Sequence, residues 1–281
     1  MASLKKPEPV TDGRKAAIIG GGPTGIAAAY FLGRAGIPVT IFEQSHKLGG
    51  VPRLVIPGFR ISEEAIEKDI ALMRFYGAEV KLNTPAPSVS ELKAMGYTHI
   101  LFAVGAWKPG KLDIPGGDAQ GVMAGIDFMR QVNGGQCSKL AGPVVVIGGG
   151  EVGVEAGMHL AKSGRNVTVL EMREKLAADT TIMHFRSMFK EYWENIPTFH
   201  SKCGVTVTEI TDEGVRYLDA DGSEQFIAAD TVAISTGMKP RRDEALAFYG
   251  TTGHFYMIGD CKKPATISTA MREAFAVASE I

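Results

Sequence analysis

Two glycine-rich turns hold the residues whose types and spacing are best suited to chemistry in this sequence. The first is AAIIGGGPTGIAAA at residues 16–29, and the second is VVVIGGGEVGVEAG at residues 144–157. In such a turn the first glycine allows a tight bend, the second lets a pyrophosphate approach the backbone, and the third lets a helix pack on a strand. The free N–H groups of the helix then face the phosphates. These glycines are Gly20, Gly22 and Gly25 in the first turn and Gly148, Gly150 and Gly153 in the second.

Each turn needs a strand before it and a helix and a second strand after it. The first copy predicts a strand at 16–20, a helix at 26–34 and a strand at 39–43; the second predicts 144–147, 154–163 and 167–171. Both second strands end on a carboxylate, Glu43 and Glu171, at the same interval after the first glycine of the turn. A carboxylate in this position accepts hydrogen bonds from the ribose hydroxyls of a dinucleotide. Two complete units therefore predict two bound adenine dinucleotides.

The segments between and after the two units supply further elements. The patterns predict a helix at 63–76, an extended run at 79–82, a helix at 89–95 and a strand within 99–106. Strands are expected within 204–210, 214–220 and 231–237. Residues 255–281 predict a strand, an acidic turn and a closing helix. The fold class is therefore α/β, with two Rossmann-like dinucleotide-binding domains.

Composition excludes several classes of protein. The chain has 281 residues, 45% of them hydrophobic and 22% charged, with a formal net charge of −1, which argues against a nucleic-acid partner. No apolar run is long enough to span a bilayer, and residues 1–15 lack the apolar core of a secretory signal, so we expect a cytoplasmic protein without a membrane span. The cysteines Cys137, Cys203 and Cys261 are too far apart for a CxxC pair or for iron–sulfur or zinc spacing, so no metal is expected.

These motifs resemble those of the two-dinucleotide-binding-domain flavoproteins, the pyridine nucleotide-disulfide oxidoreductase-like superfamily. The stretch AAIIGGGPTGIAAAYFLGRAGIPVTIFE through LGGVPRLVIPGFRISEEAIEKDI resembles the small subunit of glutamate synthase. The stretch VVVIGGGEVGVEAGMHLAKSGRNVTVLEM through AISTGMKP resembles the C-terminal FAD/NAD(P)H domains of 2-enoate and 2,4-dienoyl-CoA reductases. The resemblance implies that FAD binds at the first turn and NADH or NADPH at the second.

The resemblance also implies roles for individual residues. Asp260 of the Gly-Asp pair would contact the ribityl chain of FAD, and the helix starting at Thr266 would point at the pyrimidine edge of the flavin; the alternative is that Asp260 is only a turn residue. Val104 stands where the family usually has Thr. The candidate FAD residues are Gly20, Gly22, Pro23, Thr24, Gly25, Glu43, Gln44, Leu48, Gly49, Gly50, Arg53, Val104, Gly105, Gly259, Asp260, Thr266 and Ile267. The candidate NAD(P)H residues are Gly148, Gly150, Glu151, Val152, Gly153, Glu171, Met172, Arg173, Thr236 and Gly237.

The implied architecture is an NAD(P)H domain inserted into a discontinuous FAD domain. We expect the FAD domain at 1–116 and 240–281 and the NAD(P)H domain at 117–239, with linkers at 114–117 and 238–240. Hydride transfer between the two cofactors needs alignment but no acid or base, so no catalytic side chain is predicted. His184 and His200 are weak candidates for proton donors, and a structural role is favoured for both.

Two interpretations remain open. The favoured one is an NAD(P)H-dependent FAD oxidoreductase that passes electrons to a partner protein, a fused catalytic domain or a small acceptor. The other is a non-catalytic nucleotide-binding module or a structural domain of a larger flavoenzyme. Glu171 favours NADH, because the extra phosphate of NADPH would bring negative charge close to it, whereas Arg173 could pair with that phosphate. FAD is expected to bind non-covalently.

Overall fold

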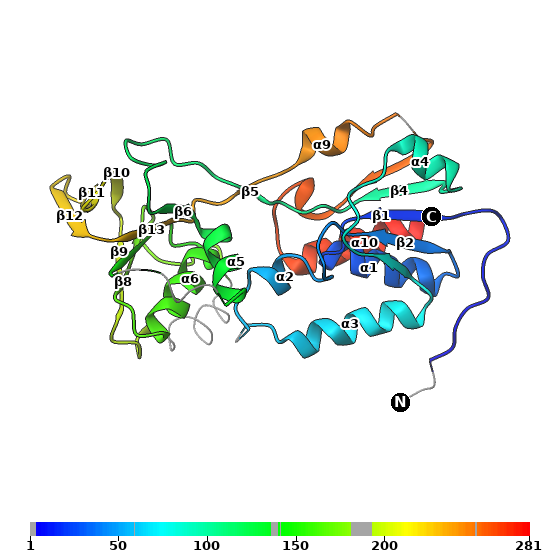
Figure 1. The fold of residues 1–281 in the computed structure, drawn as a ribbon, viewed down its shortest axis with the longest axis horizontal. Coiled ribbons are helices and arrows are strands. Elements are labelled where there is room, and N and C mark those ends of the chain that lie inside the picture. The colour runs from blue at the N-terminus through cyan, green and yellow to red at the C-terminus, as the bar shows by residue number, and fades with distance from the viewer. Residues whose placement is uncertain (1–3, 59, 136–139, 141, 181–192, 251) are drawn as a thin grey trace. The chain divides into compact units, whose positions relative to one another are not determined.

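Two compact units make up the protein (Figure 1), and the structure, a computed structural model, describes residues 4–58, 60–135, 140, 142–180, 193–250 and 252–281. Unit 1 consists of Met1–Arg53, Gly58–Lys108 and Lys239–Ile281. Unit 2 consists of Leu54–Pro57 and Pro109–Met238. Unit 1 is thus assembled from segments on both sides of unit 2 in the sequence.

Unit 1 is built on a parallel sheet with strand order β15-β4-β1-β2-β3. The strands are β1 (Ala16–Ile19), β2 (Val39–Phe42), β3 (Glu79–Lys81), β4 (His99–Phe102) and β15 (His254–Met257). The helices are α1 (Pro23–Arg34), α2 (Val51–Leu54), α3 (Glu63–Phe75), α4 (Val89–Ala94), α9 (Arg242–Leu246) and α10 (Ile267–Glu280), with a 3-10 turn, η3, at Gly259–Cys261.

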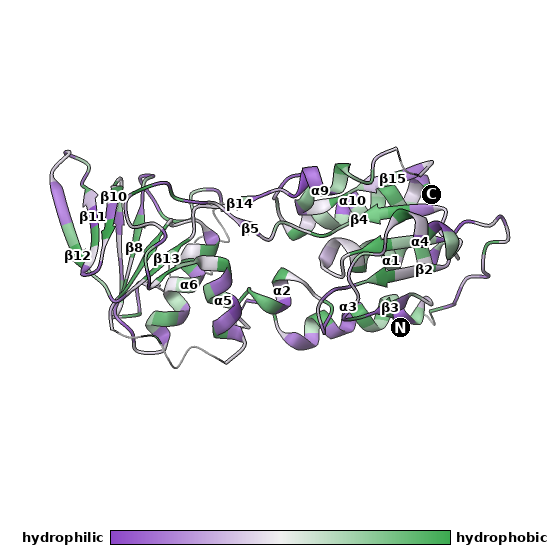
Figure 2. Ribbon diagram, turned by 45° about the horizontal axis from the view of Figure 1, so that its top comes forward, coloured by the Kyte–Doolittle hydropathy of each residue, from purple (hydrophilic) through white to green (hydrophobic). Residues whose placement is uncertain are grey.

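Alternation along these strands produces a core on each face of the sheet. Ile18, Ile41 and Leu101 pack with α1, α3 and α10 on one face. Ala17, Ile100 and their neighbours pack with residues of α4 and α9 on the other. Figure 2 shows hydrophobic residues gathered along the strands of the sheet. The three central strands, β1, β2 and β4, are buried along their whole length, as the strands of parallel sheets usually are.

Unit 2 contains a second parallel sheet, with order β6-β13-β7-β8-β9, and an antiparallel sheet β10-β11-β12. Val145, Ile147 and Ile234 face Val215 and Tyr217 of the antiparallel sheet. The strands are β6 (Val122–Ala124), β7 (Val144–Ile147), β8 (Val167–Glu171), β9 (Phe199–Cys203), β10 (Thr206–Thr211), β11 (Gly214–Leu218), β12 (Glu224–Ala228) and β13 (Thr231–Ile234). The helices among the described residues are α5 (Gly125–Asn133) and α6 (Glu151–Lys162).

The chain passes between the units along the two-stranded ladder of β5 (Lys108–Pro109) and β14 (Met238–Lys239). The units therefore change at 108/109, whereas the sequence suggested a boundary after residue 116. The reason is that Leu112 and Ile114 pack into the core of unit 2. Ile114 was expected to belong to a linker. Residues 54–57 also join unit 2, where the side chain of Asn133 donates to the carbonyl of Ile56 at 3.1 Å.

Candidate functional site

The first glycine turn follows β1 and leads into α1. Gly20 has φ +109°, and a Cβ there would lie 2.5 Å from the carbonyl oxygen of Ala103. A Cβ on Gly25 would lie 2.0 Å from the carbonyl oxygen of Gly20. Both positions therefore require glycine, the first for its backbone angle and the second for the close approach of α1 to the turn.

Glu43 closes this turn from the end of β2. Its buried carboxylate accepts the backbone N–H of Gly21 on Oε2 at 2.7 Å and that of Ser45 on Oε1 at 2.7 Å. The chain after it then folds back, and the N–H of Gly49 donates to the carbonyl of Gly21 at 2.8 Å. Backbone amides thus hold the carboxylate beside the turn in a fixed orientation.

The second turn repeats this geometry in unit 2. Glu171, also buried, accepts the N–H of Gly149 on Oε2 and the N–H of Arg173 on Oε1, the latter at 2.9 Å. A Cβ on Gly153 would lie 1.9 Å from the carbonyl oxygen of Gly148. The N–H of Ala177 donates to the carbonyl of Gly149 at 2.7 Å. This bond corresponds to the one from Gly49 to Gly21 in unit 1. The two units are therefore equivalent in their turns and in the loops that follow their second strands.

This loop is a feature that the sequence analysis identified only in the first copy. Residues 43–50 read EQSHKLGG and residues 171–178 read EMREKLAA, so both share Glu, then Lys-Leu and two small residues at equal spacing. Leu48 and Leu176 lie against the middle glycines Gly21 and Gly149. Alignment of the two copies over this stretch would have revealed the second loop. Ala177 adopts φ +48°, in the left-handed region that usually favours glycine.

The helices α1 and α6 begin without a capping side chain. Gly22 and Gly150 are their N-cap residues, and neither forms a side-chain cap. By contrast, Ser62, Ser88 and Thr266 cap α3, α4 and α10 with their hydroxyls. Uncapped N–H groups at a helix start, together with the helix dipole, bind anionic groups such as phosphates. The cradle left by the glycines and these free donors fit a dinucleotide pyrophosphate in both units.

The C-terminal segment of the chain returns to the first turn. A Cβ on Gly259, which has φ +73°, would lie 2.3 Å from Oγ1 of Thr24 in α1. The N–H of Gly259 donates to Glu273 at 2.7 Å, and Asp260 accepts the N–H of Ala265 at 3.1 Å. The pKa of Asp260 is raised, because the effect of burial exceeds the opposing effect of the hydrogen bond from Ala265. The structure thus brings Gly259 and Asp260, distant in sequence, to the start of α1.

The remaining candidates fall into a few groups. The Arg53 side chain is largely buried and donates to the carbonyl of Leu48 at 2.7 Å, to Glu63 at 3.1 Å and to Glu67. Arg53 therefore stabilises the loop of residues 48–50 through the carbonyl of Leu48. Ala103 and Ser235 are the first residues of the stretches AVGA at 103–106 and STGM at 235–238, which contain the candidates Val104, Gly105, Thr236 and Gly237. Their N–H groups donate to the carbonyls of Ile19 and Ile147 at the ends of β1 and β7. The exposed or partly exposed candidates are Gln44, Val104, Gly105, Glu151, Val152, Met172, Arg173, Thr236, Gly237, Thr266 and Ile267.

A buried carboxylate on α6 escaped the sequence analysis. Glu155 is 6% exposed, one turn into the helix that follows the second glycine turn. Its only sequence signal is a charge on the buried side of an otherwise apolar helix, VGVEAG. Because glutamate side chains are rarely buried, this position is a candidate for function.

The cysteines and histidines lie outside the two turns where they are described. Cys261 is buried in unit 1, where burial raises the pKa of its thiol, and Cys203 ends β9 in unit 2. His200 is exposed, with Nε2 3.2 Å from Oδ1 of Asn166. His184 and Cys137 lie outside the described residues.

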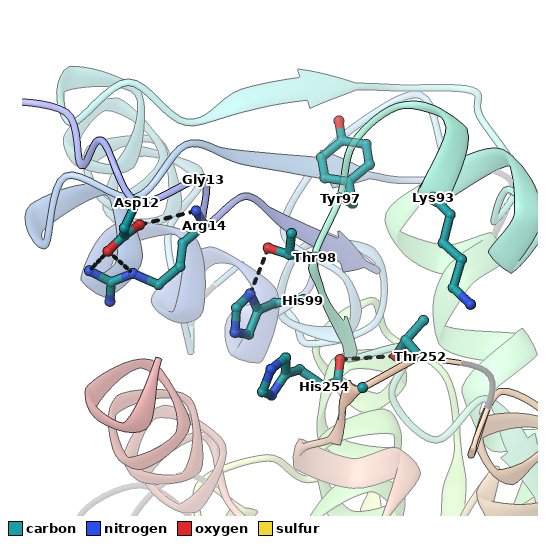
Figure 3. A pocket seen from close by; sticks show the side chains of 10 residues that line it. Asp12, Gly13, Arg14, Lys93, Tyr97, Thr98, His99, Thr252 and His254 are labelled. Carbon is teal, nitrogen blue, oxygen red and sulfur yellow. Dashed lines mark hydrogen bonds and ion pairs between the residues drawn. The ribbon is translucent and has the colours of Figure 1, made fainter.

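A polar pocket of about 440 Å³ lies at the opposite edge of the unit 1 sheet, where its strands begin (Figure 3). His99 starts β4 and His254 starts β15, and their rings stack 4.4 Å apart. Nδ1 of His99 and Oγ1 of Thr98 are 2.9 Å apart. Arg14, near the same pocket, is paired with Asp12. None of the candidate cofactor residues lines this pocket.

The family is decided by a match over most of the chain. Residues 14–274 match the model of the pyridine nucleotide-disulphide oxidoreductases. The chain belongs to this family. Rossmann-like FAD/NAD(P)-binding oxidoreductases share its fold, and FAD and NAD(P)H are the cofactors of the family. The expected resemblance and the expected α/β fold class are thereby confirmed.

Individual relatives agree with this assignment. The chain is 31% identical over 283 residues to cinnamate reductase of Clostridium sporogenes, covering 99% of the chain and 40% of the relative. It is 33% identical over 291 residues to glutamate synthase [NADH] of Schizosaccharomyces pombe, covering 87% and 14%. The solved 2-naphthoyl-CoA reductase complex has a TM-score of 0.86 at 29% identity, covering 98% of the chain and 41% of that protein.

The pyridine nucleotide-disulphide oxidoreductase chain described here thus spans less than half the length of each of these relatives. Their names describe whole proteins of which it matches one part. Among the described residues, no helix has the length and apolar character needed to cross a bilayer.

Proposed function

We propose that unit 1 holds FAD, that unit 2 holds NAD(P)H, and that the protein is an NAD(P)H-dependent FAD oxidoreductase. The observation that carries this proposal is the repeated site: in each unit an uncapped helix start stands beside a carboxylate fixed by two backbone N–H groups. The helix start receives a pyrophosphate and the carboxylate receives ribose hydroxyls. Two such sites in a member of this family serve two dinucleotides.

The assignment of FAD to unit 1 rests on the returning C-terminal segment. Gly259 packs on Thr24 at the first turn, and this contact brings Asp260 and the start of α10 to the same side of the sheet. Asp260 would accept a hydroxyl of the ribityl chain, and the N-terminus of α10 would favour negative charge on the flavin ring.

When bound, FAD accepts a hydride from the dihydronicotinamide and later passes the electrons on. The chain's own residues contribute binding and orientation. We propose that the electrons leave to a partner protein, a fused catalytic domain or a small acceptor. The support is indirect: glutamate synthase and cinnamate reductase are both much longer than this chain.

The experiment that tests the central proposal is an absorption spectrum of the purified protein. A flavin spectrum that bleaches when NADH is added without oxygen is the expected result. Heat or acid should release the flavin, because it is expected to be bound non-covalently. A colourless protein that takes up no FAD would support the alternative, a nucleotide-binding module without catalysis.

We further propose that NADH is preferred over NADPH, because Glu171 stands where the adenosine ribose would bind. Two unit charges 4 Å apart repel by about 4 kcal/mol at an effective dielectric of 20, an upper figure for the cost of a 2′-phosphate there. Glu171→Ala should therefore reduce the preference for NADH, measured as flavin reduction by each coenzyme. A parent that uses NADPH better, or an unchanged ratio in the variant, would exclude Glu171 as the discriminating residue.

A further inference from the structure

The loop of residues 172–180, which follows β8, folds over the second glycine turn. Besides the Ala177 contact with Gly149, the N–H of Thr180 donates to the carbonyl of Ala177 at 3.0 Å. The hydroxyl of Thr180 donates to Oε1 of Glu151, the first residue of α6, at 2.8 Å. The loop is therefore tied at one end to the carboxylate of Glu171 and at the other to the start of α6.

An ion pair connects these two ends. The backbone of Arg173 is bonded to Glu171, while its guanidinium donates from Nη1 to Oδ2 of Asp179 at 2.7 Å. Asp179 directly precedes Thr180, which is held at α6. The Arg173 guanidinium thus extends from Glu171, which would bind the ribose, toward the start of α6, which would bind the pyrophosphate. Both side chains are exposed, Arg173 to 53% and Asp179 to 83%.

The position of this pair suits control over a phosphate on the adenosine ribose. An arginine beside the carboxylate that binds the ribose is well placed to bind a 2′-phosphate, because a guanidinium binds phosphate through paired N–H donors. Here the same guanidinium already has a carboxylate partner. A 2′-phosphate would have to displace Asp179 from Arg173 and approach the negative charges of both Asp179 and Glu171.

We propose that Asp179 is a specificity-determining residue, which discriminates against 2′-phosphorylated coenzymes by holding Arg173. This inference rests on the proposed function, in that unit 2 is taken as the NAD(P)H site. Removing the Asp179 carboxylate frees the guanidinium and removes a repulsive charge, so both effects favour a 2′-phosphate. Because exposed ion pairs contribute at most about 1 kcal/mol, the expected gain is about twofold to fivefold.

Calorimetric binding of ADP-ribose and of 2′-phospho-ADP-ribose to the full chain tests this without any need for turnover. The variants are Asp179→Asn, Arg173→Gln and the double variant. Glu174→Gln is the matched control, since it removes one exposed carboxylate from the same loop. Measurement at physiological ionic strength limits charge effects over distances beyond about 8 Å.

Asp179→Asn should shift the affinity ratio toward 2′-phospho-ADP-ribose by about twofold to fivefold, and in the Arg173→Gln background the same substitution should give a smaller shift, because only the repulsive charge is then removed. Glu174→Gln should change the ratio less. An unchanged ratio in Asp179→Asn, a gain that is equally large in the Arg173→Gln background, or an equal gain in Glu174→Gln would overturn the inference, as would a parent that binds neither ligand. A parent that binds ADP-ribose but whose flavin is not reduced by NADH would refute the proposed activity while this test still stands.

Discussion

At the residue scale, the carboxylates of Glu43 and Glu171 accept hydrogen bonds from backbone N–H groups of the protein itself. Each uses one oxygen on a turn amide and the other on the amide two residues after itself. Hydrogen bonds to a charged group are worth about 1.5–3 kcal/mol, so each carboxylate stabilises the shape of its own turn. An ionised carboxylate has further lone pairs, which remain available to ribose hydroxyls.

Asp260 allows a residue-scale test of the FAD site. Asp260→Ala should lower FAD affinity by about tenfold or more, because it removes a charged acceptor from the ribityl chain and the bond to the N–H of Ala265. FAD content after dialysis against a fixed FAD concentration measures the effect. Asp221→Ala is the control, since Asp221 is exposed in a turn of unit 2. Equal losses in both variants would remove Asp260 from the site.

At the element scale, the strand, the turn, the helix and the following loop act as one repeated building block. The strand ends position the glycines, the glycines let the helix approach, and the Lys-Leu loop packs on the middle glycine. Because the two copies lie in separate units, one can be damaged while the other stays intact.

Matched glycine substitutions use this separation. Gly153→Ala places a methyl group 1.9 Å from the carbonyl oxygen of Gly148 and should abolish reduction by NADH while FAD stays bound. Gly25→Ala, with its methyl group 2.0 Å from the carbonyl oxygen of Gly20, should abolish FAD binding while ADP-ribose still binds to unit 2. FAD absorbance and calorimetry report the two sites, and circular dichroism controls for folding. Loss of both ligands in a folded single variant would contradict the assignment.

The stacked histidines at the start of β4 and β15 predict a pH dependence of stability. Burial first, and then the charges of His254 and Arg14, lower the pKa of His99 below its ordinary value of 6.5, against the opposing charge of Asp12. The folded protein therefore binds fewer protons than the unfolded chain near and below pH 6.5. The contribution of this pair is present above pH 6.5 and is lost as the pH falls.

The measurement is urea unfolding of the parent and of His99→Gln at pH 7.5 and 5.5. The parent should lose more unfolding free energy between the two values than the variant does, because the variant has one titrating ring fewer. If both lose the same amount, protonation of His99 is not what destabilises the sheet edge in acid.

The sequence predicted those elements whose signal is local. β7 and β8 have the predicted bounds, because an apolar run stops at a glycine or a carboxylate. The helices α1 and α6 begin at Pro23 and Glu151, three residues earlier than predicted, because the second turn glycine, Gly22 or Gly150, already serves as the N-cap. β12 was not predicted, because its residues are mostly exposed and show no buried apolar alternation. The contact of 54–57 with Asn133 was not predicted, because it joins residues distant in sequence. In the candidate site, the glycines and carboxylates were predictable and the Arg173–Asp179 pair was not.

At the scale of the whole molecule, the proposed oxidoreductase has an electron input but an unidentified output. We expect NADH to reduce artificial acceptors such as quinones or ferricyanide through the flavin, with a protein or a fused domain as physiological acceptor. Steady-state assays with each acceptor measure this. Rapid turnover of one small organic substrate by this chain alone would contradict the expectation, because it would place the output within the chain itself.

The division of unit 1 into segments on either side of unit 2 also affects the order in which the protein can fold during synthesis. Nearly all of unit 2 lies within residues 109–238, whereas the sheet of unit 1 needs β15 to pair with β4, and α1 needs α10 as a packing partner. A ribosome makes about 5–20 residues per second, starting at the N-terminus. For several seconds, therefore, unit 2 is complete while unit 1 still exposes the edge of β4 and the apolar face of α1. The growing chain must keep these surfaces from aggregating until its last helix is made.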